Sequence, residues 1–453
     1  MMSHPLPPLQ YITQCKNLFN EMVRLVDSAK THVYHVAVAL DLDSYDQRLL
    51  RAYERALDRG VKVHICTSDG IYENNCSRLS DVTHPNLVLV EQVVVDDVPE
   101  SQTMLGLVMK RIAHPSATTA SYRGQHIRFI CNETDMLMCG GNGDMASYGG
   151  TCENHDDVMY ETGVLVRGFA TSPSNTPLSW INRLFSAISS ATIHTDDTLL
   201  SQCPAHIHYK GKRTHDWLCE KIRMAKHEIY MENQYTVSYQ DMPCVDGTES
   251  TENQIMVAIA DRVKRAVRDK EEFHITYMCN ETFPDETGVA YAALNVFFAG
   301  SIRYLRSQVK CDDATFQRYV TILVPNVSAN TLIHSKVWVF DRETIMCGSS
   351  NIMDRSFSDA YGDYEMSWIF DSSTYGADVI EDMYHAIRSA APTHQTYQYT
   401  TYHVKPMAHH GFGMLAPIVD ALIPSYDWRK QLGSKQPIER AMPLLTACTK
   451  VYI

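Results

Sequence analysis

The sequence predicts a duplicated α/β fold, in which two similar halves each contain a mixed or mostly parallel sheet. Strand–helix–strand alternation occurs over residues 33–66 and again over residues 228–278. A histidine followed two residues later by a basic side chain, and then by a Cys-Gly pair, occurs in each half, at His126 and His334, which lie 334 − 126 = 208 residues apart. Two Ala-Lys pairs have a similar offset, 225 − 29 = 196 residues. Similar offsets for separate features indicate an internal duplication.

The expected elements follow from periodicity in the first half. Leu18, Met22 and Leu25 fall at helical spacing, and the largely apolar run 33–40 is typical of a buried strand. Residues 49–57 predict a helix that ends before Gly60, and residues 61–66 predict the next strand.

The same order returns in the second half. Helical periodicity over residues 217–226 leads into a strand over 228–234, and a helix over 255–267 leads into a strand over 273–278. A strand that is followed by a helix and another strand predicts a parallel pair with the helix on one face of the sheet.

These patterns divide the chain into four parts. Residues 1–170 form the expected N-terminal half and residues 205–375 the C-terminal half, joined by a connection over 171–204 that begins rich in Ser, Thr and Pro. Residues 376–453 form a C-terminal extension with weaker periodicity and no predicted role. His409 and His410 lie in this extension and are interpreted as loop residues, because no carboxylate or cysteine stands close to them in sequence.

Composition limits the class of protein. The chain has 453 residues, of which 45% are hydrophobic, which is enough for a large core. The formal net charge is −13 and no block of five basic residues occurs, which argues against a nucleic-acid binder. The 13 cysteines form no CxxC pair, so neither a disulfide scaffold nor a zinc finger is expected.

The expected location is the cytoplasm. Thiols without a disulfide spacing favour a reducing compartment. The N-terminal segment lacks the basic and apolar regions of a signal peptide, and no run of 18 apolar residues occurs, so no transmembrane helix is expected. A lipid substrate would then be reached from the aqueous side, as a peripheral membrane protein reaches it.

The strongest chemical signal is the segment around His334 and Lys336. If the segment is a strand, residues two apart share a face, so the imidazole and the ammonium point the same way while Val337 and Val339 face an apolar side. Unpaired charge is costly in a core. Around a phosphate, lysine neutralises oxygens and histidine attacks phosphorus or protonates the leaving oxygen.

Residues after this segment complete a phosphate site. Gly348 lets the backbone approach a ligand, and the side chains of Ser349 and Asn351 offer hydrogen bonds to phosphate oxygens. Downstream, the stretch 363–365 carries carboxylates, one of which we expect to hold the second ring nitrogen of the histidine at position 334.

These residues resemble a known family. The positions His334, Lys336, Asp341, Gly348, Ser349 and Asn351 match the HxKxxxxDxxxxxxGSxN signature of the phospholipase D superfamily. Residues 229–235 resemble the IYIENQ strand of eukaryotic-type phospholipases D. The resemblance covers roughly residues 15–370 as architecture and is specific over 228–235 and 332–367.

The resemblance implies a duplicated phospholipase D-like α/β fold with one active site at the interface of the halves. It implies catalysis through a phosphohistidine, with no metal and no cofactor. His126 corresponds to the nucleophile and His334 to the acid, although the sequence itself does not assign these roles. The candidate catalytic residues are His126, Arg128, His334 and Lys336. The candidate substrate-binding residues are Ser349, Asn351, Asn142, Glu232, Asn233 and Gln234, and the supporting residues are Asp341, Glu365 and Glu161.

The first motif departs from the family pattern. It reads His126-Ile127-Arg128, with Glu133 where aspartate is usual and Gly141 where serine is usual, and Asn142 stands one residue early. Arginine can still bind phosphate, with a different geometry from lysine. We expect Glu133 and Asp341 to be structural partners. Two interpretations stay open: a working pair of motifs, or a first half that has lost its chemistry.

The predicted function is hydrolysis of a phospholipid diester at a membrane surface, with transfer to other alcohols. A nuclease on the same fold is the first alternative and predicts salt-sensitive binding of single strands. A non-catalytic lipid-binding or scaffold protein, including a viral factor, is the second alternative and predicts binding without turnover. The oligomeric state is not predicted.

Overall fold

The computed structural model describes most of the chain up to residue 397. The described residues are 9–38, 40, 47–68, 83–92, 94–95, 122–123, 126–139, 159–169, 176–190, 199, 201, 203–204, 206–209, 211–238, 253–280, 298, 301–302, 304–325, 332–357, 363–391 and 394–397. Among them, no helix has both the length and the apolar composition that crossing a membrane requires.

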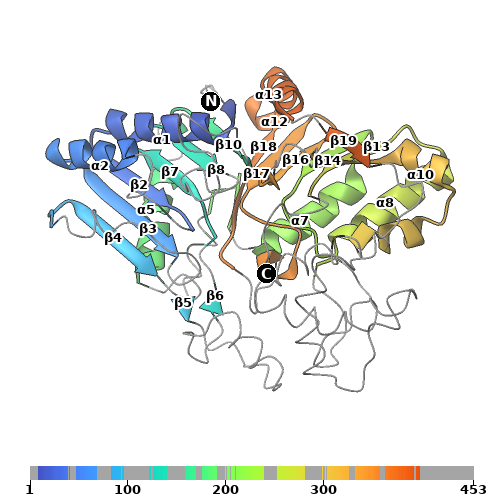
Figure 1. The fold of residues 1–453 in the computed structure, drawn as a ribbon, viewed down its shortest axis with the longest axis horizontal. Coiled ribbons are helices and arrows are strands. Elements are labelled where there is room, and N and C mark those ends of the chain that lie inside the picture. Colours follow the sequence, from blue (N-terminus) through green and yellow to red (C-terminus); the bar gives the residue numbers. More distant parts are fainter. Residues whose placement is uncertain are drawn as a thin grey trace.

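The first half is built on a seven-stranded sheet with the order β1-β10-β8-β7-β2-β3-β4. Figure 1 shows this sheet beside helices α1 and α2. The elements are β1 (Leu9–Thr13), α1 (Cys15–Ser28), β2 (His32–Val36), α2 (Arg48–Asp58), β3 (Lys62–Ser68), β4 (Leu87–Gln92), β5 (Val94–Val95), β6 (Tyr122–Arg123), β7 (Phe129–Asn132), β8 (Met136–Cys139), β9 (Met159–Tyr160), β10 (Thr162–Val166) and α5 (Thr176–Ser189).

The second half is built on an eight-stranded sheet with the order β11-β18-β17-β16-β12-β13-β14-β19. Its elements are β11 (Ile207–Tyr209), α7 (Gly211–Met224), β12 (Glu228–Glu232), α8 (Ile255–Asp269), β13 (His274–Met278), α10 (Asp313–Tyr319), β14 (Val320–Pro325), β15 (Leu332–Ile333), β16 (Val337–Phe340), β17 (Thr344–Gly348), α11 (Asp354–Phe357), β18 (Met366–Asp371), α12 (Ser372–Tyr375), α13 (Ala377–Ala390) and β19 (His394–Tyr397).

The two sheets have the same topology. Each of the seven strands from β1 to β4 in the first order has a counterpart from β11 to β14 in the second, and the directions of neighbouring strands agree at every pairing. The duplication expected from the motif offsets is therefore present in the strand order. Strand β19, in the expected C-terminal extension, adds an antiparallel edge to β14.

The sheets are mixed, which is one of the two forms that the sequence predicted. Only β2–β3 and β3–β4 are parallel in the first sheet, and only β12–β13 and β13–β14 in the second. The other neighbouring strands pair antiparallel. Short turns connect the pairs β7–β8 and β16–β17, whereas the other antiparallel pairs join strands that lie further apart in the sequence. Strand–helix–strand periodicity predicts only the parallel pairs.

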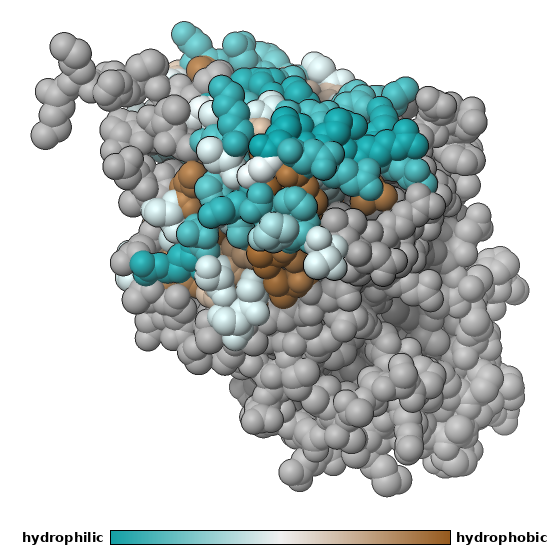
Figure 2. Space-filling view, turned by 90° about the vertical axis from the view of Figure 1, so that its left-hand side faces the viewer, coloured by the Kyte–Doolittle hydropathy of each residue, from teal (hydrophilic) through white to brown (hydrophobic). Residues whose placement is uncertain are grey.

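Helices separate the core into outer and inner layers. The apolar faces of α1 and α2 cover the outer face of the first sheet, and those of α7 and α8 cover the outer face of the second. Figure 2 shows hydrophilic residues gathered over the upper part of the first half, where α1 and α2 lie. The inner layer includes residues of both sheets together with α5 and α13, so the halves share one core.

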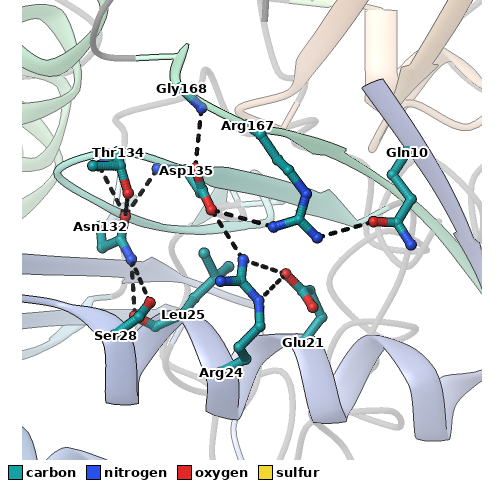
Figure 3. A network of polar contacts seen from close by, with 10 residues as sticks. All are labelled: Gln10, Glu21, Arg24, Leu25, Ser28, Asn132, Thr134, Asp135, Arg167 and Gly168. Carbon is teal, nitrogen blue, oxygen red and sulfur yellow. Dashed lines mark hydrogen bonds and ion pairs between the residues drawn. The ribbon is translucent and has the colours of Figure 1, made fainter. Parts of the chain in front are cut away.

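A polar network fixes the β7–β8 turn to helix α1 (Figure 3). The side chain of Asn132 accepts hydrogen bonds from the backbone of Thr134 and Asp135 at 2.8 Å and donates one to the carbonyl of Leu25 at 3.0 Å. Asp135 pairs with Arg24 at 3.0 Å. These contacts hold the turn against helix α1.

An acidic residue in the β7–β8 turn, and another in the β16–β17 turn, holds the start of the central strand of its sheet, β2 or β12. Glu133 accepts hydrogen bonds from the backbone N–H groups of residues 30–32, at 2.8 to 3.4 Å. Asp341 accepts three equivalent bonds from residues 226–228, at 2.7 to 2.9 Å. The two carboxylates therefore occupy matching structural positions at one end of β2 and β12.

Candidate active site

The two motif histidines lie at equivalent places in the two halves. His126 precedes β7 by three residues and His334 precedes β16 by three residues, so both lie outside the strands, contrary to the strand expected for residues 334–336. The backbone N–H of His126 donates to the carbonyl of Tyr364, and that of His334 donates to the carbonyl of Tyr160, both at 3.0 Å. Each histidine is thus held by the opposite half.

Each imidazole is also oriented by a glutamate of the opposite half. Nδ1 of His126 lies 2.9 Å from Oε2 of Glu365, and Nδ1 of His334 lies 2.7 Å from Oε2 of Glu161. The expectation that a carboxylate in 363–365 holds His334 was wrong. The parallel pairing of β15 with β9 places His334 beside Glu161, although Glu365 is closer in sequence.

The remaining ring nitrogen of His126 faces its own motif. Nη2 of Arg128 lies 2.7 Å from Nε2 of His126. Because a guanidinium only donates, Nε2 is the acceptor and the ring proton lies on Nδ1, toward Glu365. This tautomer leaves a lone pair on Nε2, which is the form that a nucleophile needs.

Lys336 is held differently from Arg128. Its side chain is wholly buried, and Nζ donates to Oε1 of Gln234 at 3.0 Å and to the carbonyl of His334 at 2.6 Å. The sheet registers place Val38 at the position equivalent to Gln234. The first half therefore has no amide at this place to accept a bond from its basic residue.

Hydroxyl groups fix Glu365. Its carboxylate accepts hydrogen bonds from the hydroxyls of Ser349 and Ser356, the second at 2.6 Å. Burial alone would raise the pKa of Glu365. The combined effect of His126 and these two hydroxyls is larger and opposite, so the pKa lies below its ordinary value. Ser349, which was expected to bind substrate, thus donates its hydroxyl hydrogen bond to Glu365.

The other expected substrate-binding residues differ in their surroundings. Asn351 is buried, and its Oδ1 has no hydrogen-bond partner among the described residues. Asn233 braces the loop after β17, since its Oδ1 accepts the N–H of Ile352 at 3.1 Å. Glu232 is wholly buried and accepts the hydroxyl of Tyr230 at 2.6 Å. Asn142 lies outside the described residues.

Burial and positive charge both act on the second histidine. Burial lowers the pKa of His334 well below its ordinary value, and the charges of Lys336 and Arg128 and the nearby His126 lower it further. These effects require the four side chains to lie close together. Burial also lowers the pKa of Lys336, with Arg128 contributing in the same direction. For His126, burial outweighs Glu365 and lowers the pKa.

The sequence contains a signal for the crossed pairs that motif reading alone does not use. A Tyr-Glu dipeptide directly before an apolar strand occurs in both halves, at Tyr160-Glu161 and at Tyr364-Glu365. In each dipeptide the tyrosine carbonyl and the glutamate carboxylate hold one histidine. As for metals, no group of three His, Cys, Asp or Glu side chains converges anywhere in the described part of the chain.

Comparison with known structures decides the fold. The chain superposes on phosphatidylserine synthase from Haemophilus influenzae with a TM-score of 0.59 and 10% identity, over 92% of this chain and 96% of that one. The chain has a duplicated phospholipase D-like fold. At this level of identity the likeness concerns the fold alone.

Sequence comparison finds partial relatives. The chain is 29% identical over 158 residues to phospholipase D A from Dictyostelium discoideum and 29% identical over 182 residues to phospholipase D from Phytophthora infestans. These matches cover 31% and 36% of this chain, but only 12% and 10% of the relatives. No protein-family model matches the sequence.

Proposed function

We propose that the chain is a phosphodiesterase that transfers a phosphatidyl group through a phosphohistidine. The crossed pairs support this most directly: the partly exposed His126 and the buried His334, one from each half, are each oriented through Nδ1 by a glutamate of the other half. Such an orientation fixes the tautomer and leaves Nε2 of each ring for chemistry. Arg128 and Lys336 supply positive charge beside them.

In the first step, Nε2 of His126 attacks phosphorus. A bound phosphodiester draws the Arg128 guanidinium from Nε2 to a phosphate oxygen, which exposes the lone pair. The new N–P bond forms as the P–O bond to the leaving alcohol breaks, and His334 gives its proton to that oxygen. The anion offsets the charges of Arg128 and Lys336, so the pKa of His334 rises and the ring can carry that proton.

In the second step, His334 acts as a base. It takes a proton from water or from an alcohol, the oxygen attacks phosphorus, and the N–P bond breaks to regenerate His126. Glu365 stabilises the positive charge that the ring of His126 carries as a phosphohistidine, and Glu161 does the same for protonated His334.

The phospholipid substrate is proposed from the named relatives. Two proteins with partial sequence similarity are called phospholipase D, and the structural neighbour is called phosphatidylserine synthase. The net charge of −13 also disfavours a polyanionic substrate such as nucleic acid.

The test is transfer to an alcohol. Purified protein is incubated with vesicles of phosphatidylcholine, or of mixed phospholipids, together with a primary alcohol and a chelator, and the phosphatidyl-alcohol is measured. We expect product from the wild type and none from His126→Ala or His334→Ala. His385→Ala is the matched control, because that side chain is 64% exposed and lies on α13.

Other outcomes separate the alternatives. Cleavage of a single-stranded oligonucleotide without any phosphatidyl-alcohol would replace this proposal with a nuclease. Vesicle binding that needs Lys336, without turnover of any phosphodiester, would replace it with a lipid-binding protein.

A further inference from the structure

Glu232 is a buried acid that the two proposed steps do not use. It ends β12, with its side chain fully removed from solvent. Oε1 accepts the hydroxyl of Tyr230 at 2.6 Å. Oε2 has no hydrogen-bond partner among the described residues. A buried carboxyl oxygen without a partner is costly, so this position calls for an explanation.

The surroundings of Glu232 come from both halves. Burial raises its pKa to about 7, while the hydroxyls of Ser335, Tyr230 and Tyr160 and the charge of Arg388 oppose that rise. Tyr160 belongs to the first half, and Arg388 lies on α13 above the ring of Tyr230, at 4.6 Å. The acid therefore lies where the first half, β12 and α13 meet. The charge of Glu232 also raises the pKa of two further groups, Tyr11 of β1 and Cys347 of β17.

The fold itself does not require an acid at this position. Glu232 pairs with Val337, the residue after Lys336, and in the first sheet Val36 pairs with Phe129, the residue after Arg128. Val36 is thus the counterpart of Glu232 in the repeat and is equally buried. The second half has an acid where the first has a hydrocarbon.

Ser335 connects this acid to the catalytic segment. It lies between His334 and Lys336 and is fully buried, and its Oγ, like Oε2 of Glu232, has no hydrogen-bond partner among the described residues. Glu232 pairs with Val337, and Ser335 lies two residues before Val337, so the acid and the hydroxyl are diagonal neighbours across the two segments, within reach of a glutamate side chain. The Ser335 hydroxyl also opposes the rise in the pKa of Glu232. A hydrogen bond between them would fix the backbone that carries both catalytic side chains.

We propose that Glu232 is a positioning residue for the reaction, which holds the His334–Lys336 segment through the hydroxyl of Ser335. The proposal rests on the proposed function. The ionised carboxylate accepts the Ser335 hydroxyl more strongly than the neutral acid does, because charge-assisted hydrogen bonds are stronger. Turnover should therefore rise as Glu232 loses its proton.

The kinetic test compares Glu232→Gln with the wild type across pH. We expect kcat of the wild type to rise through an inflection near pH 7, and this inflection to be absent in Glu232→Gln, with KM changed less than about threefold. Glu232→Val, which introduces the residue of the repeat, should lower kcat by about tenfold or more. Glu272→Gln, at an exposed position, is the matched control.

A double-mutant cycle tests the route through Ser335. Ser335→Ala should lower kcat to a similar extent as Glu232→Val, and the double variant should be no slower than either single variant. An inflection that persists in Glu232→Gln, or additive losses in the cycle, would overturn the proposal. A rise in KM at constant kcat would overturn it too, because it would make Glu232 a substrate-binding residue.

Histidine NMR separates this proposal from the function on which it rests. If the protein turns over no phosphodiester, the proposed function fails, but the ring signals of His334 and His126 can still be followed in the ligand-free protein. We expect Glu232→Gln to move the signals of His334 and to leave those of His126 in place. Unmoved signals of His334 would overturn the positioning role, whatever the activity.

Discussion

The first half presents a guanidinium to a phosphate, at Arg128, where the second half presents the ammonium of Lys336. The guanidinium donates to Nε2 of His126, the nucleophile of the proposed reaction, at 2.7 Å, and Val38 stands at the position that Gln234 occupies in the second half. We predict that Arg128→Ala lowers turnover by about 10- to 100-fold, the worth of one charged hydrogen bond to the transition state.

Arg128→Lys should keep turnover within about tenfold of the wild type, because the positive charge remains. Steady-state kinetics on vesicles measure both variants. Arg24→Ala serves as the control, since that arginine pairs with Asp135 in the structural network of α1. An inactive Arg128→Lys variant would show that positive charge alone is not enough, and that turnover needs the two-pronged hydrogen bonding of the guanidinium.

The assignment of the two histidines predicts a difference between substrates. A general acid matters most when the leaving oxygen is a poor leaving group. With a p-nitrophenyl phosphodiester, His334→Ala should release p-nitrophenol in its first turnover at a rate within about 100-fold of the wild type, whereas His126→Ala should release none. Release of p-nitrophenol measures both variants. The reverse pattern would exchange the roles of the histidines.

At the scale of elements, the acidic turn residues Glu133 and Asp341 fix the starts of β2 and β12. Each accepts hydrogen bonds from three consecutive backbone N–H groups. We predict that Asp341→Ala lowers the free energy of unfolding by about 1–3 kcal/mol, because three backbone donors lose a charged acceptor, with little change in kcat. Urea denaturation measures this.

Asp382→Ala, at an exposed position on α13, is the control for that experiment. A loss of turnover at unchanged stability would show instead that Asp341 belongs to the catalytic machinery.

The sequence predicted most elements but not how they pair. Helical spacing such as that of Leu18, Met22 and Leu25 reports which face of α1 is buried, and the structure confirms that face. The helices α5 and α13 were missed because residues 171–204 were interpreted from their Ser, Thr and Pro content, and residues 376–453 from their weak periodicity. Strand direction depends on turns and on long-range pairing, which local periodicity does not contain.

At the scale of the whole molecule, the site depends on the meeting of the halves. The residues around His334 could be predicted, because they lie in one short stretch of the sequence, from His334 to Asn351. The crossed partners could not be derived from spacing, since Glu161 lies 334 − 161 = 173 residues from its histidine and reaches it only through the β9–β15 pairing. The repeated Tyr-Glu dipeptide becomes informative once the pairing is known.

The acid at the interface of the halves also predicts a pH dependence of stability. Burial raises the pKa of Glu232 from 4.5 to about 7, so the folded protein binds its proton more tightly than the unfolded chain does. The resulting contribution to the free energy of unfolding is fully present below pH 4.5 and is lost as pH rises through 7. Relative to Glu232→Gln, the wild type should lose about 3 kcal/mol of unfolding free energy between pH 4.5 and 8.

Parallel urea denaturation of the wild type and Glu232→Gln, at several pH values, measures this difference. Stability differences that do not depend on pH would mean that Glu232 titrates normally in the folded protein.

The covalent intermediate tests the central claim most directly. Wild-type protein and the His126→Ala and His334→Ala variants are mixed with a phosphatidyl p-nitrophenol, quenched, digested and analysed by mass spectrometry under conditions that preserve phosphoramidates. We predict a phosphatidyl adduct on His126, longest lived in His334→Ala because that variant lacks the base for the second step, and no adduct in His126→Ala. Release of p-nitrophenol without any histidine adduct, or an adduct that survives in His126→Ala, would contradict the account.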